Sequence, residues 1–308
     1  MNKIIITGSS GFVAKNLINY LVESKHHLIP LSRVSGFNYS NINFKYINSN
    51  SVDGIIHIAG KAHSFNNISN IDEYYKVNTE LTINLFDAFL ASKAKVFITL
   101  SSVKAVSDKV EGELDEEVSP NPITHYGKSK LLSDQYILSR PIPEGKRVYV
   151  LRPCMIHGPS NKGNLNLLYS VVSKGLPWPL GAYENIRSYL SIENLCFIIR
   201  ELIDGYEIPS GVYNLADDVP ISTNEIIEMI VESKGKKTKI LNLGKKLIKV
   251  LARIGDFTKL PLNSERLQKL TESYVVSNSK IKAALGKPLP VSSKEGLIRT
   301  FQSFADNA

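Results

Sequence analysis

Short apolar segments of two alternating kinds constrain the fold of this chain more than any other feature. Between stretches with apolar residues at spacings of three and four, as in NLINYLVES (16–24) and NTELTINLFDAFLASK (78–93), lie brief, β-branched runs. Such alternation predicts an α/β fold with a doubly wound parallel sheet, whose strands are buried on both faces and whose ligands bind at their carboxyl ends. The predicted strands are KIIIT (3–7), HLIPLS (27–32), FKYI (44–47), DGIIHIAG (53–60), KVFITLSS (95–102) and RVYVLRP (147–153).

One spacing is irregular. Only about five residues separate FKYI from DGIIHIAG, whereas neighbouring parallel strands need a crossover of roughly a dozen residues. We therefore expect a plain loop in place of a crossover helix; the alternative is that the two strands are not adjacent.

The length of 308 residues and a change in residue composition along the chain indicate two lobes. After residue 160, Gly, Pro and Asn interrupt shorter helices. We predict one domain over residues 1–160 and a smaller lobe over 161–308, with 187–216 returning to the first domain. Residues 245–257, KKLIKVLARIGDF, form an amphipathic basic helix, which we expect to pack against its own lobe; contact with a membrane surface is the alternative.

The composition is that of a globular protein without a membrane span, since no apolar run approaches roughly 18 residues. The two cysteines are far apart and predict neither a disulfide framework nor a metal site, which fits a cytoplasmic protein. A formal charge of +8 suits a polyanionic partner, but the basic residues are dispersed. We therefore expect a phosphorylated small molecule, and neither nucleic acid nor a membrane.

The first predicted strand leads into a glycine-rich turn that opens a helix. In such a turn the glycines let the backbone approach a pyrophosphate, and the helix N-terminus offers free N–H groups. The predicted contacts are Gly8, Ser10, Gly11, Phe12 and Val13. At the end of the second strand, Arg33 stands where an acid often binds the adenosine ribose. Arg33 favours the 2′-phosphate of NADP; alternatively it stacks on adenine, which leaves NAD usable.

Tyr126 and Lys130 lie four positions apart in a predicted helix and so share one face. An ammonium about 4 Å from a phenolate stabilises it by on the order of 4 kcal/mol at an effective dielectric constant near 20. We therefore expect Lys130 to lower the pKa of Tyr126 toward neutrality, where a phenol exchanges protons efficiently.

These residues, taken in order, resemble the extended short-chain dehydrogenases/reductases, and within them the nucleotide-sugar 4-epimerases and 4-ketoreductases of bacterial polysaccharide biosynthesis. The resemblance covers nearly the whole chain, through TGSSGFVA, IIHIAG, LSSVKAV, YGKSK, RPCMIHGP, KGNLNLL and YVVSNSKIKAALG. It implies a Rossmann-like NAD(P)-binding domain, a nucleotide-sugar-binding lobe, and a homodimer formed through helices at 79–92 and 126–139.

The resemblance also implies the site. The catalytic set is Ser102, Tyr126 and Lys130, with Tyr126 as the proton donor to C4, and no metal takes part. Further cofactor contacts are Ala59, Gly60, Asn78, Pro153 and Met155. Expected contacts with a UDP- or dTDP-linked sugar are His63, Lys104, Asn164, Trp178, Leu180, Arg187 and Arg266. One departure from the family is His157 in place of a usual tyrosine, which leaves packing on the nicotinamide side open.

Three functions fit this set. Val103 and Lys104 occupy the places of the acid pair of the 4,6-dehydratases, so dehydration is not expected. Because Arg33 favours exchangeable NADP(H), we favour a 4-ketoreductase of a 4-keto-6-deoxy-hexose or N-acetylhexosamine nucleotide. A 4-epimerase of a UDP-hexose or UDP-N-acetylhexosamine with bound NAD is the alternative, and a non-catalytic dinucleotide sensor is the third.

Overall fold

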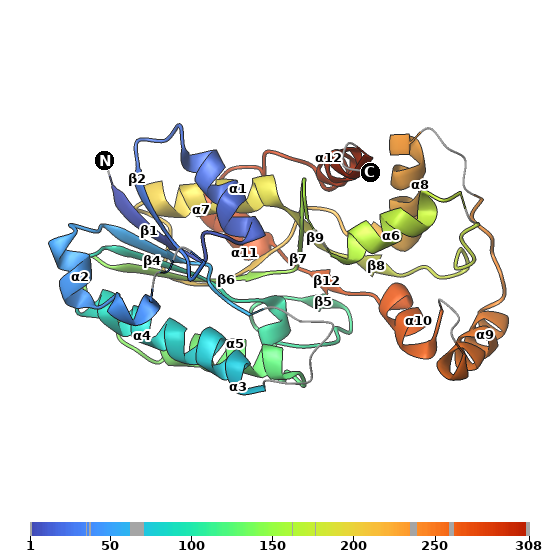
Figure 1. Cartoon of the computed structure of the whole chain (residues 1–308), viewed down its shortest axis with the longest axis horizontal. Coiled ribbons are helices and arrows are strands. Elements are labelled where there is room, and N and C mark those ends of the chain that lie inside the picture. The colour runs from blue at the N-terminus through green and yellow to red at the C-terminus, as the bar shows by residue number, and fades with distance from the viewer. Residues whose placement is uncertain are drawn as a thin grey trace.

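A six-stranded, wholly parallel sheet forms the centre of the molecule (Figure 1). The computed structural model describes residues 2–34, 36, 38–61, 71–161, 163–175, 177–234, 239–258 and 262–305. The strand order β10-β6-β4-β3-β1-β2 confirms the predicted doubly wound α/β fold. The strands are β1 (Lys3–Thr7), β2 (His27–Leu31), β3 (Gly54–His57), β4 (Val96–Leu100), β6 (Arg147–Pro153) and β10 (Gly211–Leu215).

Helices cover both faces of this sheet (Figure 1). Side chains alternate along each strand, so Ile4 and Ile6 pack into one core while Ile5 packs into the other. One face carries α1 (Phe12–Leu21), α7 (Ile192–Asp204) and α11 (Ser279–Leu285). The other carries α2 (Phe44–Ser49), α3 (Ile71–Tyr74), the π-helical segment η2 (Tyr75–Glu80), α4 (Leu81–Leu90) and α5 (His125–Leu138).

The segment FKYI is a helix, α2, and its prediction as a strand is wrong. Asn43 caps α2 by accepting a hydrogen bond from the backbone N–H of Tyr46 at 3.0 Å, and Ile47 is buried. Since β2 and β3 both pair with β1, α2 belongs to the crossover between them. Because FKYI is part of the crossover and not a strand, the connection between the consecutive strands β2 and β3 has the usual length. The sequence misled because a short aromatic and β-branched run carries no periodicity that separates helix from strand.

The second lobe has its own core, in which Tyr169 stacks on Phe301 and meets Phe304 edge-on. Between the visits to this lobe the chain returns to the sheet through α7 and β10, and again through α11. The helices of the lobe are α6 (Asn164–Val172), α8 (Thr223–Lys234), α9 (Lys245–Phe257), α10 (Ser264–Thr271) and α12 (Ser293–Ala305). Short elements complete the chain: η1 (Tyr39–Asn41), η3 (Val103–Ala105), β5 (Glu113–Leu114), β7 (Met155–His157), β8 (Ile186–Arg187), β9 (Tyr189–Ser191), β11 (Ile221–Ser222) and β12 (Val275–Val276).

The helix α9 departs from expectation. Of its apolar residues at 247, 248, 250, 251 and 254, only Ile248 is buried, and the other four are exposed. The prediction that this apolar face packs against its own lobe is therefore wrong for most of the face. In the described residues, no helix is both long and apolar enough to cross a membrane.

Candidate active site

A large cavity lies at the carboxyl ends of the sheet strands, where a doubly wound fold is expected to bind its ligand. Its volume of about 1360 Å³ exceeds the roughly 300–1,000 Å³ typical of small-molecule sites. Predicted residues that line it are Gly8, Ser10, Gly11, Phe12, Val13, Arg33, Ala59, Gly60, Ser102, Tyr126, Lys130 and Pro153. Both the predicted phosphate loop and the predicted catalytic set therefore face one cavity.

The glycine loop needs its first glycine on two grounds. Gly8 has a φ of +73°, and a Cβ there would lie 2.8 Å from the backbone of Ala59. The Gly8 N–H donates to the phenol oxygen of Tyr39 at 2.8 Å, and that phenol donates to the carbonyl of Leu31 at 3.1 Å. Tyr39 thus fixes the loop to the end of β2. The sequence carries no motif signal for Tyr39.

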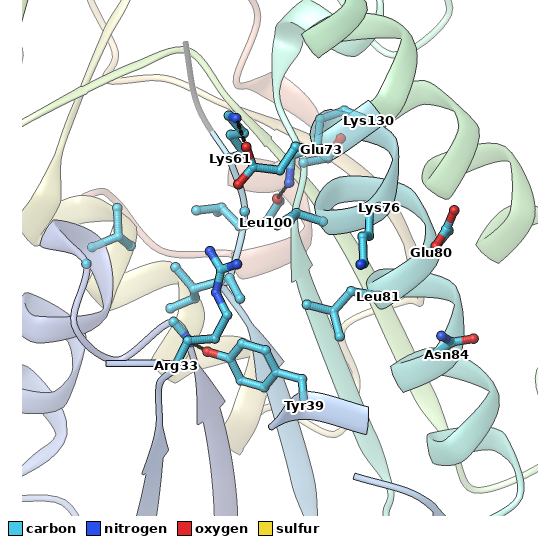
Figure 2. Close-up of a pocket in the computed structure, with 18 of the residues that line it drawn as sticks. Arg33, Tyr39, Lys61, Glu73, Lys76, Glu80, Leu81, Asn84, Leu100 and Lys130 are labelled. Carbon is cyan, nitrogen blue, oxygen red and sulfur yellow. Dashed lines mark hydrogen bonds and ion pairs between the residues drawn. The ribbon is translucent and has the colours of Figure 1, made fainter. Parts of the chain in front are cut away.

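The outer end of the cavity is rich in charge. Arg33 extends into the cavity between Tyr39 and Glu73, and Lys61 points at Glu73 and forms an ion pair with it (Figure 2). The hydrogen bond from Lys61, and the positive charge of Arg33, hold the pKa of Glu73 below its usual value. Lys76 adds a third cation to the lining. Arg33 and Lys76 can bind the phosphates of a dinucleotide, while Asp72, Glu80 and Asp87 add negative charge elsewhere in the lining.

Local structure fixes Tyr126 beside Ser102. Thr124 caps α5 by accepting from the N–H of Gly127 at 3.2 Å, and the carboxylate of Asp108 accepts from the N–H of Thr124 at 3.0 Å. A side chain at Gly127 would collide with the carbonyl oxygen of Lys104, so glycine lets α5 approach the turn that follows Ser102. Ser102 lies close enough to Tyr126 for its hydroxyl to lower the pKa of the phenol.

Lys130 is buried and donates its Nζ hydrogen to the carbonyl of Leu100 at 2.8 Å, at the end of β4 (Figure 2). Burial lowers the pKa of Lys130 to about 8. Burial also raises the pKa of Tyr126, although the hydrogen bond from Ser102 lowers it. The expectation that Lys130 brings the pKa of Tyr126 toward neutrality is therefore wrong for this structure, because burial outweighs the other influences on the phenol.

Asn78 joins the two halves of the site from the π-helical segment η2. Its side-chain oxygen accepts from the N–H of Lys61 at 2.8 Å, and its amide donates to the hydroxyl of Ser129 at 3.0 Å. Asn78 is buried and does not line the cavity, so it braces the loop after β3 against α5. A π-helical turn at such a position is common at functional sites.

A buried ionic network behind Lys130 escaped the sequence analysis. Asp134 lies one turn further along α5 and accepts hydrogen bonds from Ser101 and from Arg152, each at 2.9 Å. Burial raises the pKa of Asp134, while the guanidinium of Arg152 lowers it. The four-residue spacing from Lys130 is the signal that could have placed a carboxylate on the same helix face.

Two of the predicted substrate residues, Lys104 and Arg187, influence each other electrostatically. The Nζ of Lys104 donates to the carbonyl of Asp108 at 2.8 Å and lies 4.3 Å above the ring centre of Tyr274. Arg187 donates to the carbonyl of Glu272 at 2.9 Å. Burial lowers the pKa of Lys104, and the positive charge of Arg187 adds to this effect. Lys104 and Arg187 are thus parts of one electrostatic cluster.

Lys104, Arg187 and the remaining predicted residues that the structure describes do not line the cavity. Trp178 and Leu180 are buried in the core of the second lobe, Met155 packs against that same core, and Arg266 is exposed on α10. His157, which stands where the family usually has a tyrosine, is buried, and its Nδ1 lies 2.9 Å from the hydroxyl of Thr300. His63 and the side chain of Asn164 lie outside the described part of the structure.

Comparison with known proteins assigns the chain to a family. Residues 4–216 match the NAD dependent epimerase/dehydratase family. The chain belongs to this family. The resemblance found in the sequence is confirmed, and so is its consequence that the protein is an enzyme that uses NAD or NADP.

Members of the family resemble the chain over most of its length. A UDP-glucose 4-epimerase of Vibrio cholerae is 30% identical and covers 98% of this chain and 95% of its own. An N-acetyl-alpha-D-glucosaminyl-diphospho-ditrans,octacis-undecaprenol 4-epimerase of Escherichia coli O157:H7 is 26% identical over 74% of this chain and 71% of its own. Among solved structures, RMD from Pseudomonas aeruginosa complexed with NADPH has a TM-score of 0.75 at 20% identity and covers 100% of both chains.

Proposed function

We propose that this protein is a 4-epimerase of a UDP-linked hexose or N-acetylhexosamine. The observation that carries the proposal is that Ser102, Tyr126 and buried Lys130 line the same cavity as the glycine loop. The full-length similarity to a UDP-glucose 4-epimerase supports this reaction over the reductase that the sequence alone favours.

The chemistry follows from the groups that line the cavity. When bound, NAD⁺ supplies the hydride acceptor and brings a positive charge into the cavity. Tyr126 accepts the proton of the C4 hydroxyl as the hydride leaves, and returns it to the C4 oxygen when hydride is restored to the other face. Ser102 orients that oxygen by a hydrogen bond, and the ammonium of buried Lys130 would hold the nicotinamide ribose, as the family resemblance implies.

A 4-ketoreductase is the second candidate, and Arg33 is the observation that favours it. Its guanidinium extends into the outer end of the cavity, where it suits the 2′-phosphate of NADP (Figure 2). A reductase would use the same three residues, with Tyr126 giving its proton to the carbonyl oxygen of a 4-keto-sugar.

The two reactions differ in what happens to the cofactor. For an epimerase, the purified protein carries a nicotinamide dinucleotide and converts UDP-glucose to UDP-galactose, or the N-acetyl pair, without added cofactor. For a reductase, NADPH is oxidised only when a nucleotide 4-keto-6-deoxy-sugar is supplied. Absence of both activities from a protein that binds the dinucleotide would contradict the proposal, as would formation of a 4-keto-6-deoxy product by dehydration.

We also propose a homodimer formed through α4 and α5. Leu132 and Leu138 are exposed on α5, which supports an apolar contact there. Sedimentation velocity that gives a monomer at micromolar concentration would contradict it.

A further inference from the structure

Three sectors divide the surface of α9, and two of them have no role in the proposed reaction. Ile248, Ala252 and Gly255 face the second lobe and are buried. A second sector, which we call the apolar strip, repeats at spacings of three and four residues and is exposed, with Phe257 at 92% and Leu247 at 52%. The apolar strip consists of Leu247, Val250, Leu251, Ile254 and Phe257.

A row of cations borders the apolar strip on one side. We call it the basic strip; it consists of Lys246, Lys249 and Arg253, which share a helix face at spacings of three and four residues. All three are exposed, and within the described parts of the chain none of them forms a salt bridge. Arg253 is close enough to Asp256 to lower the pKa of its carboxyl, and the other two cations face solvent. Exposed apolar residues flanked by exposed cations are the pattern of a helix that lies in the interface of an anionic bilayer.

The position of α9 permits such a contact. The helix lies at the end of the molecule remote from the six-stranded sheet, next to α10 (Figure 1). It is held firmly, because a side chain at Gly255 would collide with the carbonyl of Leu262 and because Ile248 and Ala252 are buried. A rigid helix at one tip of the molecule can meet a flat surface without interference from the nucleotide-binding domain.

A second copy of this chain fits the face less well. The same face of another copy could cover the apolar strip, but it would set the basic strip against further cations. The carboxylate of Asp256 on that helix already accepts from the N–H and the hydroxyl of Ser264 at 2.8 and 2.6 Å. An anionic lipid surface offers negative charge for the basic strip and apolar chains for the apolar strip. We propose that α9 docks this protein on membranes that contain anionic lipid.

Co-sedimentation with vesicles tests the proposal on the full chain. We expect the protein to bind vesicles of phosphatidylglycerol and phosphatidylcholine in equal parts, to bind pure phosphatidylcholine at least about tenfold more weakly, and to be released by high salt. The variant Lys246→Gln/Lys249→Gln/Arg253→Gln should lose roughly fivefold in affinity for each cation, on the order of a hundredfold in all. The variant Leu247→Gln/Leu251→Gln/Phe257→Gln should lose more than about tenfold.

A matched control removes the same charge elsewhere. Lys25, Lys45 and Lys294 are exposed on other elements, and the triple change of these lysines to glutamine should leave binding within about threefold of the parent. Unchanged thermal unfolding midpoints would show that the α9 variants are folded. Equal binding to neutral vesicles, or equal losses in the control and α9 variants, would overturn the proposal. It would also fail if no vesicle were bound and the α9 variants instead lowered the oligomeric state, because a second copy would then cover the face.

Discussion

At the scale of single residues, the site depends on polar groups held in places where water is scarce. Lys130 keeps its ammonium in a buried position through one carbonyl, that of Leu100, and near the carboxylate of Asp134. Tyr126 is partly buried in the cavity wall, and Ser102 lowers the pKa of its phenol. Buried polar groups of this kind reduce the free energy of unfolding and are retained for chemistry. Their substitution should therefore lower activity without a matching loss of stability.

Replacing Tyr126 with Phe tests the proton transfer. The variant keeps the ring but loses the phenol, so turnover should fall by about 10²–10⁴-fold while the dinucleotide remains bound. Substrate turnover and cofactor content of the purified variant are the measurements. Tyr75→Phe, on η2, removes a phenol outside the cavity lining and should leave turnover near the parent value. Activity retained in Tyr126→Phe would remove Tyr126 from the reaction.

Replacing Lys130 with Met should stabilise the fold and abolish activity. Lowering the pKa from 10.5 to about 8 corresponds to about 3 kcal/mol at neutral pH, from which loss of the hydrogen bond to Leu100 subtracts about 1. We therefore expect the free energy of unfolding at pH 7 to rise by about 2 kcal/mol.

The difference in stability between the parent and Lys130→Met should change with pH. Between about pH 8 and 10.5 the unfolded chain holds a proton at Lys130 that the folded chain has lost, so the parent gains stability as pH rises and its deficit against Lys130→Met shrinks. Denaturant unfolding at pH 7 and pH 10 measures this change. Lys128→Met, at an exposed neighbouring position on α5, is the control for a lysine-to-methionine change and should leave the unfolding free energy at pH 7 near the parent value. A constant difference between the parent and Lys130→Met from pH 7 to 10 would contradict the assignment.

At the scale of elements, one contact places the catalytic helix. The first turn of α5 packs on η3, the short turn after Ser102, and the contact is close because Gly127 has no side chain. The Asp108 carboxylate and the Thr124 cap fix the start of the same helix. The distance between Ser102 and Tyr126 is therefore set by two elements that lie apart in the sequence.

Gly127→Ala should push these elements apart. The added methyl group would meet the carbonyl of Lys104, so we expect a loss of about 1–3 kcal/mol in unfolding free energy and at least about tenfold in turnover. Thermal unfolding and turnover measure both. Gly145→Ala, in a turn with open space around it, is a control for activity, although its φ of +78° will reduce stability. A fully active Gly127→Ala would mean that α5 can shift without harm to the site.

At the scale of the whole molecule, a neutral histidine ties the sheet to one of its helix layers. His57 ends β3, and its two ring nitrogens lie 2.8 Å from the hydroxyl of Thr7 on β1 and 2.9 Å from that of Thr82 on α4. Burial, together with the charge of Lys130, lowers the pKa of His57 to about 3. The folded protein therefore holds His57 uncharged throughout the physiological range.

Acid should destabilise the fold through His57. The unfolded histidine takes up a proton below its pKa of about 6.5 and the folded one does not until about 3, so stability is complete above pH 6.5 and is lost as pH falls. Between pH 7 and 5 the loss should be about 2 kcal/mol. His57→Gln should lack this component. The measurement is the pH dependence of unfolding for both proteins, and parallel profiles would contradict the assignment.

The sequence by itself determined the sheet, five of its strands, the glycine loop and the presence of Tyr126 and Lys130 in one cavity, because these depend on periodicity and on residues that are neighbours along the chain. Tertiary structure alone decided that FKYI is a helix, since a short apolar run fits either state until its neighbours are placed. It also brought Tyr39 to the glycine loop and Asp134 to Arg152, contacts that join distant segments. The pKa of Tyr126 follows the same division. The spacing predicted a downward shift caused by Lys130, but burial, which only packing creates, raises this pKa.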